Sequence, residues 1–291
     1  MTLQRLLIFL ALLTIFSCTT SKPHFQADDD PTPEGKKWVK IEAMSDEFEG
    51  KELDNKKWKN TEPQRWVGRP PAIFKKDAVR LEDGELKITN YLLEETETVK
   101  GNTFTHSGGM LRSKELHVYG YYECKMKASK TFMSSTFWLI NYPSGEGCER
   151  RVTELDIQEC VGRVVTEEKW ASTFDTHIHS NTHHRYGRKD LEDCPPRNSN
   201  GQNVSIGGFV HDDYHVYGVW WKNEKEALFY LDGVFQYKIT FPSDFNLPMF
   251  LNMVTETYNW NPVPEDGGLL GSEEERTTSY QWVRSWELTD R

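Results

Sequence analysis

Short runs of alternating polar and apolar residues recur along most of the chain and constrain its fold more than any other feature. At 81–88 and 229–237, two such runs flank an Asp-Gly pair, which favours the tight turn of a β-hairpin. Further candidate strands lie at 121–128, 135–141, 214–222, 249–255 and 279–288. Since helical periodicity is nearly absent, we expect an all-β fold, either a β-jelly-roll sandwich of two antiparallel sheets or a large barrel.

The segment 121–128 shows the alternation clearly. One parity is apolar and the other is charged, the charged set being Glu123, Lys125 and Lys127. This pattern is typical of an antiparallel strand with one face in the core and the other in water. We therefore expect these three charged side chains to be exposed.

The first residues have the features of a targeting signal followed by a linker. Arg5 precedes an apolar run at 6–16 that is too short to span a bilayer and fits a secretory signal. Ser17 and Cys18 follow, as in a bacterial lipoprotein signal, with ordinary signal cleavage nearby as the alternative. Residues 19–35 are polar and contain proline, which is typical of a flexible tether. We expect a signal over 1–18 that ends at a lipidated Cys18, a tether over 19–35, and a single domain over 36–291.

Charge and aromatic content narrow the function further. The net charge of −10 argues against a protein that binds nucleic acid electrostatically. Aromatic residues make up 13% of the chain, which fits either a large β core or a share of exposed stacking platforms.

The cysteines allow several arrangements in an exported protein. If Cys18 carries lipid, the remaining four can pair in three ways, and they are Cys124, Cys148, Cys160 and Cys194. Cys148 and Cys194 lie in loop-like surroundings, so one loop disulfide with two buried thiols is one of the outcomes. The chain has no CxxC pair, which argues against a structural zinc site.

The segment TELDIQE at 153–159 places three acids in six positions of a candidate strand. In a regular strand Glu154 and Asp156 share a face, while Glu159 points to the opposite face, into the core. One extra residue, a β-bulge near Ile157 or Gln158, would return Glu159 to the face of the other two acids. We therefore predict a bulge at this point.

Three acids on one face have a specific chemical use. Retaining glycoside hydrolysis needs a nucleophilic carboxylate and a protonated carboxylic acid, with the two groups about 5–5.5 Å apart. Asp156 between them would support the nucleophile, and mutual repulsion would keep a proton on the acid. A solvated acidic strand face or a calcium site would also account for such a cluster.

The acids also belong to a recognisable pattern. Residues 154–159 match the E-x-D-x-x-E signature of glycoside hydrolase family 16, and the resemblance covers most of residues 36–291. Other matching segments are 45–50, 53–54, 58, 108–113, 137–138, 220–221 and 232–233. The resemblance implies a single catalytic jelly-roll domain with a concave substrate cleft. It also implies that Glu154 is the nucleophile, Asp156 its supporting acid and Glu159 the acid/base.

Two further segments, 65–71 and 177–184, resemble the branch of that family that acts on red-algal galactans, the porphyranases and agarases. Porphyran carries 6-sulfate groups on L-galactose, and the guanidinium of arginine suits such an oxyanion. Arg69 is a candidate sulfate donor, with Trp66 stacking on the sugar. Arg150 and Arg151 are further candidates, unless they only screen the acids or pair with Glu149.

Other candidates for substrate binding lie in segments before and after the acidic signature. Trp138 precedes the signature and is expected to stack on a sugar, with a core position as the alternative. The side chains His177, His179, Asn181 and His183 share one parity and would form a polar groove wall. Glu256 and Trp260 are expected to contact sugar hydroxyls and a sugar face.

The resemblance implies that no cofactor is required. A structural calcium ion occurs in many members of the family, and the sequence offers Glu47 and Glu287 as candidate ligands for it.

The sequence therefore predicts an exported endo-hydrolase of β-1,4-galactosidic bonds, either a cell-surface lipoprotein or a periplasmic or extracellular form. Porphyran is the expected substrate, and agarose is the second candidate. A β-glucanase or a non-catalytic carbohydrate-binding jelly roll would also be compatible with this fold. We expect a monomer whose partner is the polysaccharide, with no nucleic acid and with membrane attachment only through the lipid on Cys18.

Overall fold

The computed structural model describes residues 22–187, 194 and 197–291, so the signal expected over 1–18 lies outside the described residues. The strands are β1 (Lys36–Lys40), β2 (Trp58–Lys59), β3 (Gly68–Arg69), β4 (Ala72–Phe74), β5 (Val79–Glu82), β6 (Glu85–Thr89), β7 (Leu92–Val99), β8 (Asn102–Ser113), β9 (Gly120–Lys127), β10 (Ser134–Ile140), β11 (Arg151–Val161), β12 (His177–Tyr186), β13 (Asn198–Ser205), β14 (His215–Trp221), β15 (Glu226–Leu231), β16 (Val234–Thr240), β17 (Phe250–Thr255) and β18 (Thr277–Asp290). Short 3-10 helices are η1 (Ala27–Asp29), η2 (Glu42–Met44), η3 (Gly147–Glu149), η4 (Lys169–Ala171) and η5 (Glu274–Arg276). None of the described helices is long and apolar enough to cross a membrane.

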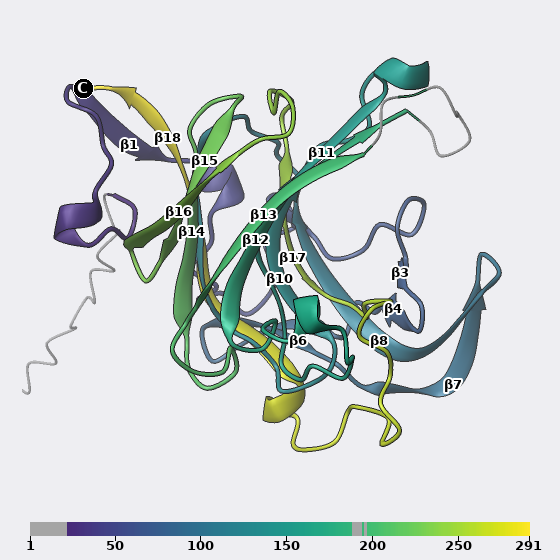
Figure 1. The fold of residues 1–291 in the computed structure, drawn as a ribbon. Coiled ribbons are helices and arrows are strands. Elements are labelled where there is room, and N and C mark those ends of the chain that lie inside the picture. Colours follow the sequence, from purple (N-terminus) through teal and green to yellow (C-terminus); the bar gives the residue numbers. More distant parts are fainter. Residues whose placement is uncertain (1–21, 188–193, 195–196) are drawn as a thin grey trace, which may run out of the picture.

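The strands form two layers (Figure 1). The outer sheet has the order β16-β15-β14-β9-β18-β6-β5, with β1 paired to β18. The cleft sheet has the order β13-β12-β11-β10-β17-β8-β4-β3, with β2 and β7 paired to β8. The described strand pairs are antiparallel except β4 with β8, which run parallel. The all-β sandwich of the jelly-roll kind is confirmed.

Both predicted hairpins are present. Two-residue turns join β5 to β6 and β15 to β16. In the first turn Asp83 and Gly84 have φ of 56° and 75°, and in the second Asp232 and Gly233 have φ of 51° and 81°. Positive φ at both central positions is the geometry that an Asp-Gly pair adopts at low cost, which explains why the sequence located these turns.

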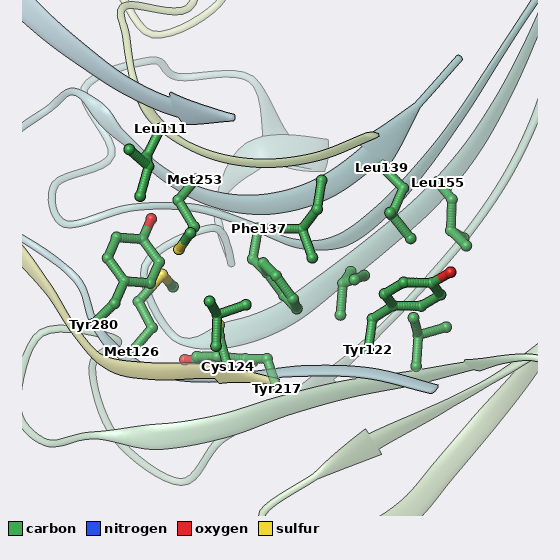
Figure 2. Close-up of a cluster of buried hydrophobic side chains, with 14 of the residues drawn as sticks. Leu111, Tyr122, Cys124, Met126, Phe137, Leu139, Leu155, Tyr217, Met253 and Tyr280 are labelled. Carbon is green, nitrogen blue, oxygen red and sulfur yellow. The ribbon is translucent and has the colours of Figure 1, made fainter. Parts of the chain in front are cut away.

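The main core lies between the two sheets (Figure 2). The cleft sheet contributes Leu111, Phe137, Leu139, Leu155 and Met253, and the outer sheet contributes Tyr122, Cys124, Met126, Tyr217 and Tyr280. All of these side chains are fully buried. Since alternate residues of each strand face this layer, the cleft sheet is left with a second face for polar and aromatic groups.

Residues 22–35, part of the segment expected to be a flexible tether, contact the far face of the outer sheet. The Phe25 ring packs against Tyr121 and Tyr230, with ring centroids 4.6 and 5.3 Å apart. The backbone N–H of His24 donates to the Glu123 carboxylate at 3.0 Å. Glu123 is consequently buried, so the expectation that it would be exposed is wrong. A strand pattern cannot show which distant segment covers its polar face.

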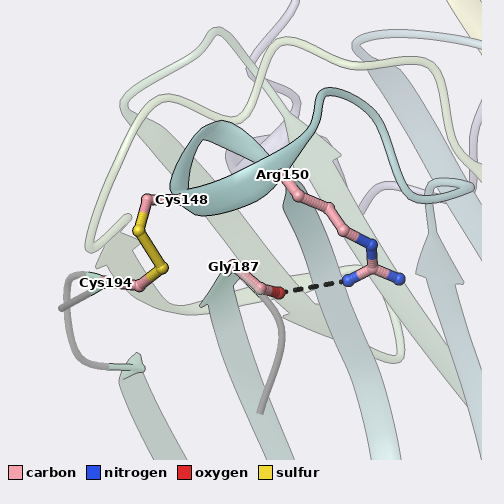
Figure 3. Close-up of a disulfide and its surroundings, with 4 residues drawn as sticks. All are labelled: Cys148, Arg150, Gly187 and Cys194. Atoms are coloured by element: carbon pink, nitrogen blue, oxygen red, sulfur yellow. Dashed lines mark hydrogen bonds between the residues drawn. A yellow bond between two sulfur atoms is a disulfide. The ribbon is translucent and has the colours of Figure 1, made fainter. Parts of the chain in front are cut away.

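One disulfide joins Cys148 of η3 to Cys194, while Cys124 and Cys160 are buried thiols (Figure 3). This is the arrangement with one loop disulfide. The two bonded residues lie 46 positions apart, so the bond links the approach to β11 with the segment after β12.

Candidate active site

The predicted bulge is present in β11. Against β10, Phe137 pairs with Gln158 and Trp138 pairs with Asp156, so Ile157 is the extra residue. The ladder between β11 and β12 ends at Asp156. After Asp156 the Gln158 side chain takes the place of backbone pairing with β12. Its Nε2 donates to the His177 carbonyl at 3.2 Å, and its Oε1 accepts the His179 backbone N–H at 2.8 Å.

The bulge brings the three acids to one cavity. Glu154, Asp156 and Glu159 all line a cavity of about 560 Å³ on the face of the cleft sheet that points away from the core. Leu155 and Cys160 point into the core. The predicted change of parity therefore separates the acids from the apolar residues of the same strand.

Glu154 is held as a carboxylate. Arg185 on β12 donates to Glu154 Oε1 at 2.6 Å, and His183 Nε2 lies 4.0 Å from the same oxygen. Burial raises the pKa of Glu154, but the Arg185 charge and hydrogen bond outweigh it and leave that pKa below its ordinary value. An ionised carboxylate is the form required of a nucleophile.

Asp156 and Glu159 have the opposite tendency. Burial, followed by the Glu154 charge, raises the pKa of Asp156 well above its ordinary value. Burial, followed by the charge at Asp156, raises the pKa of Glu159 to about 8, although the Tyr258 hydroxyl donates to Glu159 Oε1 at 2.9 Å. Glu159 therefore carries a proton at neutral pH, which is the form required of a general acid.

A fourth acid lies in the same cavity. Glu256 follows β17, and Arg69 of β3 approaches its Oε1 to 3.1 Å. Burial raises the pKa of Glu256 to about 7 against the opposing effect of Arg69. The Arg69 guanidinium also lies 5.2 Å from the centre of the Tyr258 ring. Both residues predicted to bind substrate, Arg69 and Glu256, thus line the cavity as a pair.

The two tryptophans predicted to stack on sugars lie together. Trp66 and Trp138 line the cavity, with ring centroids 5.8 Å apart. Trp138 Nε1 donates to the Thr136 hydroxyl at 3.1 Å. Because both rings are only partly buried, the cavity side of each remains available to a ligand.

The histidine row of β12 divides into two parts. His183 reaches the acids, with its Nε2 3.4 Å from Asp156. His179 is buried, stacks on Phe174 with ring centroids 3.8 Å apart, and shares a hydrogen bond with Thr173 at 2.9 Å. Burial lowers the pKa of His179 to about 4, so this ring is neutral at physiological pH.

Two predicted arginines lie elsewhere. Arg150 donates to the Gly187 carbonyl at 3.3 Å, beside the disulfide (Figure 3). Arg151 contacts the Asp244 carbonyl and the Asn246 side chain. Neither lines the cavity that holds the acids. Their position just before the strand was therefore a poor guide to the direction of their side chains.

The sequence analysis gave no role to several residues that line the cavity or contact its acids, among them Arg65, Arg112, Arg185 and Tyr258. Arg185 continues the parity of His183, so extending that row by one step identifies it. Arg112 follows the core residue Leu111 and faces the cavity, where it pairs with Glu62 and donates to Asn252 at 2.7 Å. No pattern in the sequence indicates that Tyr258 reaches Glu159 across 99 positions.

The two residues offered as calcium ligands, Glu47 and Glu287, lie beside basic side chains. Both oxygens of Glu47 are engaged by cations, since Lys40 and Arg284 lie at 2.8 Å from its two oxygens. Glu287 lies 3.9 Å from His117. A calcium ion requires six to eight oxygen ligands, and calcium binding at these residues stays a prediction.

One group of the described residues has ligand atoms close enough to hold a metal. Atoms of Glu154, Asp156 and His183 lie within 4.8 Å of one another. Arg185 already neutralises Glu154 by direct contact, so this arrangement is better explained as a charge network around the acids.

Several known proteins are similar to this chain in sequence and fold. The family model described as "Beta-porphyranase A-D, GH16 domain" matches residues 38–288. Beta-porphyranase B of Zobellia galactanivorans is 48% identical over 289 residues, which cover 99% of this chain and 97% of that protein. The crystal structure of porphyranase B from Zobellia galactanivorans matches with a TM-score of 0.87 and 49% identity, covering 92% of this chain and 100% of that chain. Beta-agarase B of Zobellia galactanivorans is 28% identical over 208 residues, covering 68% of this chain and 54% of that protein.

Proposed function

This chain belongs to the beta-porphyranase A–D family of glycoside hydrolase family 16 domains and is a glycoside hydrolase, and on this premise we propose that it cleaves the β-1,4-galactosidic bonds of porphyran. The reaction is endo-acting and retains the anomeric configuration. The observation that carries the proposal is the position of Glu154, Asp156 and Glu159 on one bulged strand facing one cavity. There the Arg185 contact favours an ionised Glu154 and burial favours a protonated Glu159.

The roles follow from those protonation states. Glu154 attacks the anomeric carbon while Glu159 protonates the oxygen of the leaving sugar, which gives a covalent glycosyl-enzyme. Glu159, now ionised, then takes a proton from the water that releases the product. Asp156 supports Glu154, and Arg185 keeps Glu154 charged before attack. These carboxylates supply every proton transfer, so no cofactor enters the reaction.

The choice of porphyran over agarose is supported by the family and by the charge of the cavity. Three arginines line the cavity, although the chain as a whole carries a net charge of −10. Arg69 and Arg112 face carboxylates, whereas the Arg65 guanidinium lies 4.3 Å from the centre of the Tyr142 ring. We assign recognition of a substrate sulfate to Arg65 and Arg69, beside the sugar platform of Trp66 and Trp138.

The cellular location is part of the proposal. The apolar run at 6–16 and the adjoining Ser17-Cys18 support export, followed by lipid attachment at Cys18. The enzyme would then work as a monomer at the cell surface, or in the periplasm or medium, with the polysaccharide as its partner.

The test incubates the chain separately with porphyran, agarose and laminarin and determines the masses of the products. We expect sulfate-bearing oligosaccharides from porphyran and much slower cleavage of the other two. Efficient cleavage of agarose would favour a beta-agarase, and cleavage of laminarin would favour a β-glucanase.

A pair of variants tests the catalytic assignment. Glu154→Gln removes the nucleophile but keeps its shape, so turnover should fall at least about a thousandfold while the protein stays folded. Glu149→Gln is the matched control, because Glu149 is an exposed glutamate on η3 outside the cavity. Near wild-type turnover by Glu154→Gln would rule out the assignment.

A further inference from the structure

A row of aromatic rings extends from the acid/base candidate to the protein surface. Tyr258 bonds Glu159, and its ring stacks on Trp260 with centroids 5.1 Å apart. Trp260 contacts Phe174 at 4.7 Å and Trp170 at 5.1 Å between ring centroids. We call Phe174, Trp170 and Trp260 the aromatic lip.

The aromatic lip lies on the cleft side of the molecule. Phe174 stacks on His179, which shares a strand face with His183, and His183 contacts Asp156. The cavity lining includes Tyr258 but none of the three lip residues, so the lip begins where the cavity ends. It therefore continues the cavity on the side of β12 and Glu159.

Two loops hold the lip in place. Trp170 and Phe174 belong to the connection between β11 and β12, and Trp260 to the connection between β17 and β18. The buried Asn261 side chain links these loops, accepting the Val165 backbone N–H at 2.7 Å and donating to the Arg163 carbonyl at 3.0 Å. Because these loops are already fixed, they lose less conformational entropy when a ligand binds.

We propose that the aromatic lip binds the leaving-group side of the galactan chain, with Trp170 as the contact farthest from the cleaved bond. This proposal rests on the function proposed above. Because Glu159 protonates the leaving oxygen, the sugars released in that step pass the side of the cavity where Glu159 and Tyr258 lie. Trp66 and Trp138 then serve the sugars on the other side of the bond.

The exposure of Trp170 supports a binding role. Its side chain is 55% exposed, although it packs edge-on against two other rings. A tryptophan that served only to close the core would be covered, whereas a partly exposed indole beside a cleft offers an apolar face to the C–H groups of a sugar. The class of ligand is therefore a neutral or sulfated galactose residue of the leaving chain.

The test compares Trp170→Ala with the wild-type chain on two kinds of substrate, taking the galactan that the wild type cleaves best. On the polysaccharide, kcat/KM should fall about tenfold, because the alanine no longer covers the apolar face of one sugar. On an aryl glycoside of the corresponding oligosaccharide, whose leaving group is too small to reach Trp170, kcat/KM should change less than about twofold.

The position of cleavage gives an independent result. On an oligosaccharide labelled at its reducing end, loss of binding on the leaving-group side should move cleavage toward the label. Phe235→Ala is the control, since Phe235 is 41% exposed on β16 of the outer sheet, and it should leave both kinetics and cleavage position unchanged.

A binding measurement separates this proposal from the function on which it rests. In the Glu154→Gln background, Trp170→Ala should weaken polysaccharide binding about tenfold by calorimetry, whether or not the nucleophile is correctly assigned. Unchanged binding, an unchanged cleavage position, or an equal loss on polysaccharide and aryl glycoside would overturn the assignment of the lip.

Discussion

Replacing Arg185 by leucine removes the charge that keeps Glu154 ionised. The two side chains are 31% and 15% exposed and lie 2.6 Å apart, so the pair is mostly desolvated. Breaking a buried ion pair costs about 3–5 kcal/mol, and partial exposure reduces the expected cost to about 2–3 kcal/mol. The same loss raises the pKa of Glu154, because the Arg185 charge and hydrogen bond no longer oppose the effect of burial.

The sign of the pH effect follows from the direction of the shift. The folded-state pKa of Glu154 lies below its ordinary value, so the pair stabilises the protein above the unfolded-state pKa of about 4.3 and loses this contribution as pH falls through the folded-state pKa. In Arg185→Leu the acidic limb of the kcat/KM profile should move to higher pH, because the pKa of Glu154 rises. The stability deficit should be present at pH 7 and should shrink as pH falls through the folded-state pKa of Glu154.

Denaturant unfolding and pH-dependent kinetics measure both effects, with Arg185→Lys as the control that keeps a positive charge. In a Glu154→Gln background the same Arg185→Leu change should cost little, because no buried carboxylate is left unpaired. An equal loss of stability in both backgrounds, or an acidic limb that does not move, would refute this account of Glu154.

Further predictions concern the acid/base, the bulge and the disulfide. Tyr258→Phe removes the hydroxyl that stabilises ionised Glu159, so the Glu159 pKa of about 8 should rise. The basic limb of the kcat/KM profile should then move up by about 0.7 pH units, and a limb at the wild-type position would contradict this. Deleting Ile157 makes the pairing of β11 with β10 regular and leaves Glu159 opposite Thr136 on the cavity face, but it removes a core side chain and brings Gln158 to the core face opposite Phe137. The free energy of unfolding should therefore fall in denaturant titrations, and an equally stable deletion protein would contradict this account of the bulge. Replacing Cys148 and Cys194 by serine should lower the free energy of unfolding by about 3–4 kcal/mol in denaturant titrations, because the disulfide closes a loop of 46 positions. Equal stability of the two proteins would show that the disulfide does not stabilise the fold.

Features with a local physical cause were accessible from the sequence. The turns at Asp83 and Asp232 were predictable because the positive φ that a tight hairpin needs is favoured by Asp-Gly. The bulge at Ile157 was predictable because a regular strand would have placed Glu159 in the core. The burial of Glu123 was not predictable, because it depends on contact with His24, 99 positions away.

Strand parity and turn geometry depend on near neighbours in the chain, so the all-β class, the hairpins and the set of acids on β11 were predictable from the amino-acid sequence. Only the tertiary structure decided which groups control the protons of those acids. Arg185 lies 31 positions from Glu154, and Tyr258 lies 99 positions from Glu159, and each meets its carboxylate through strand register and loop packing. Charges interact according to distance in space, so the pKa values at this site are a property of the folded sheet.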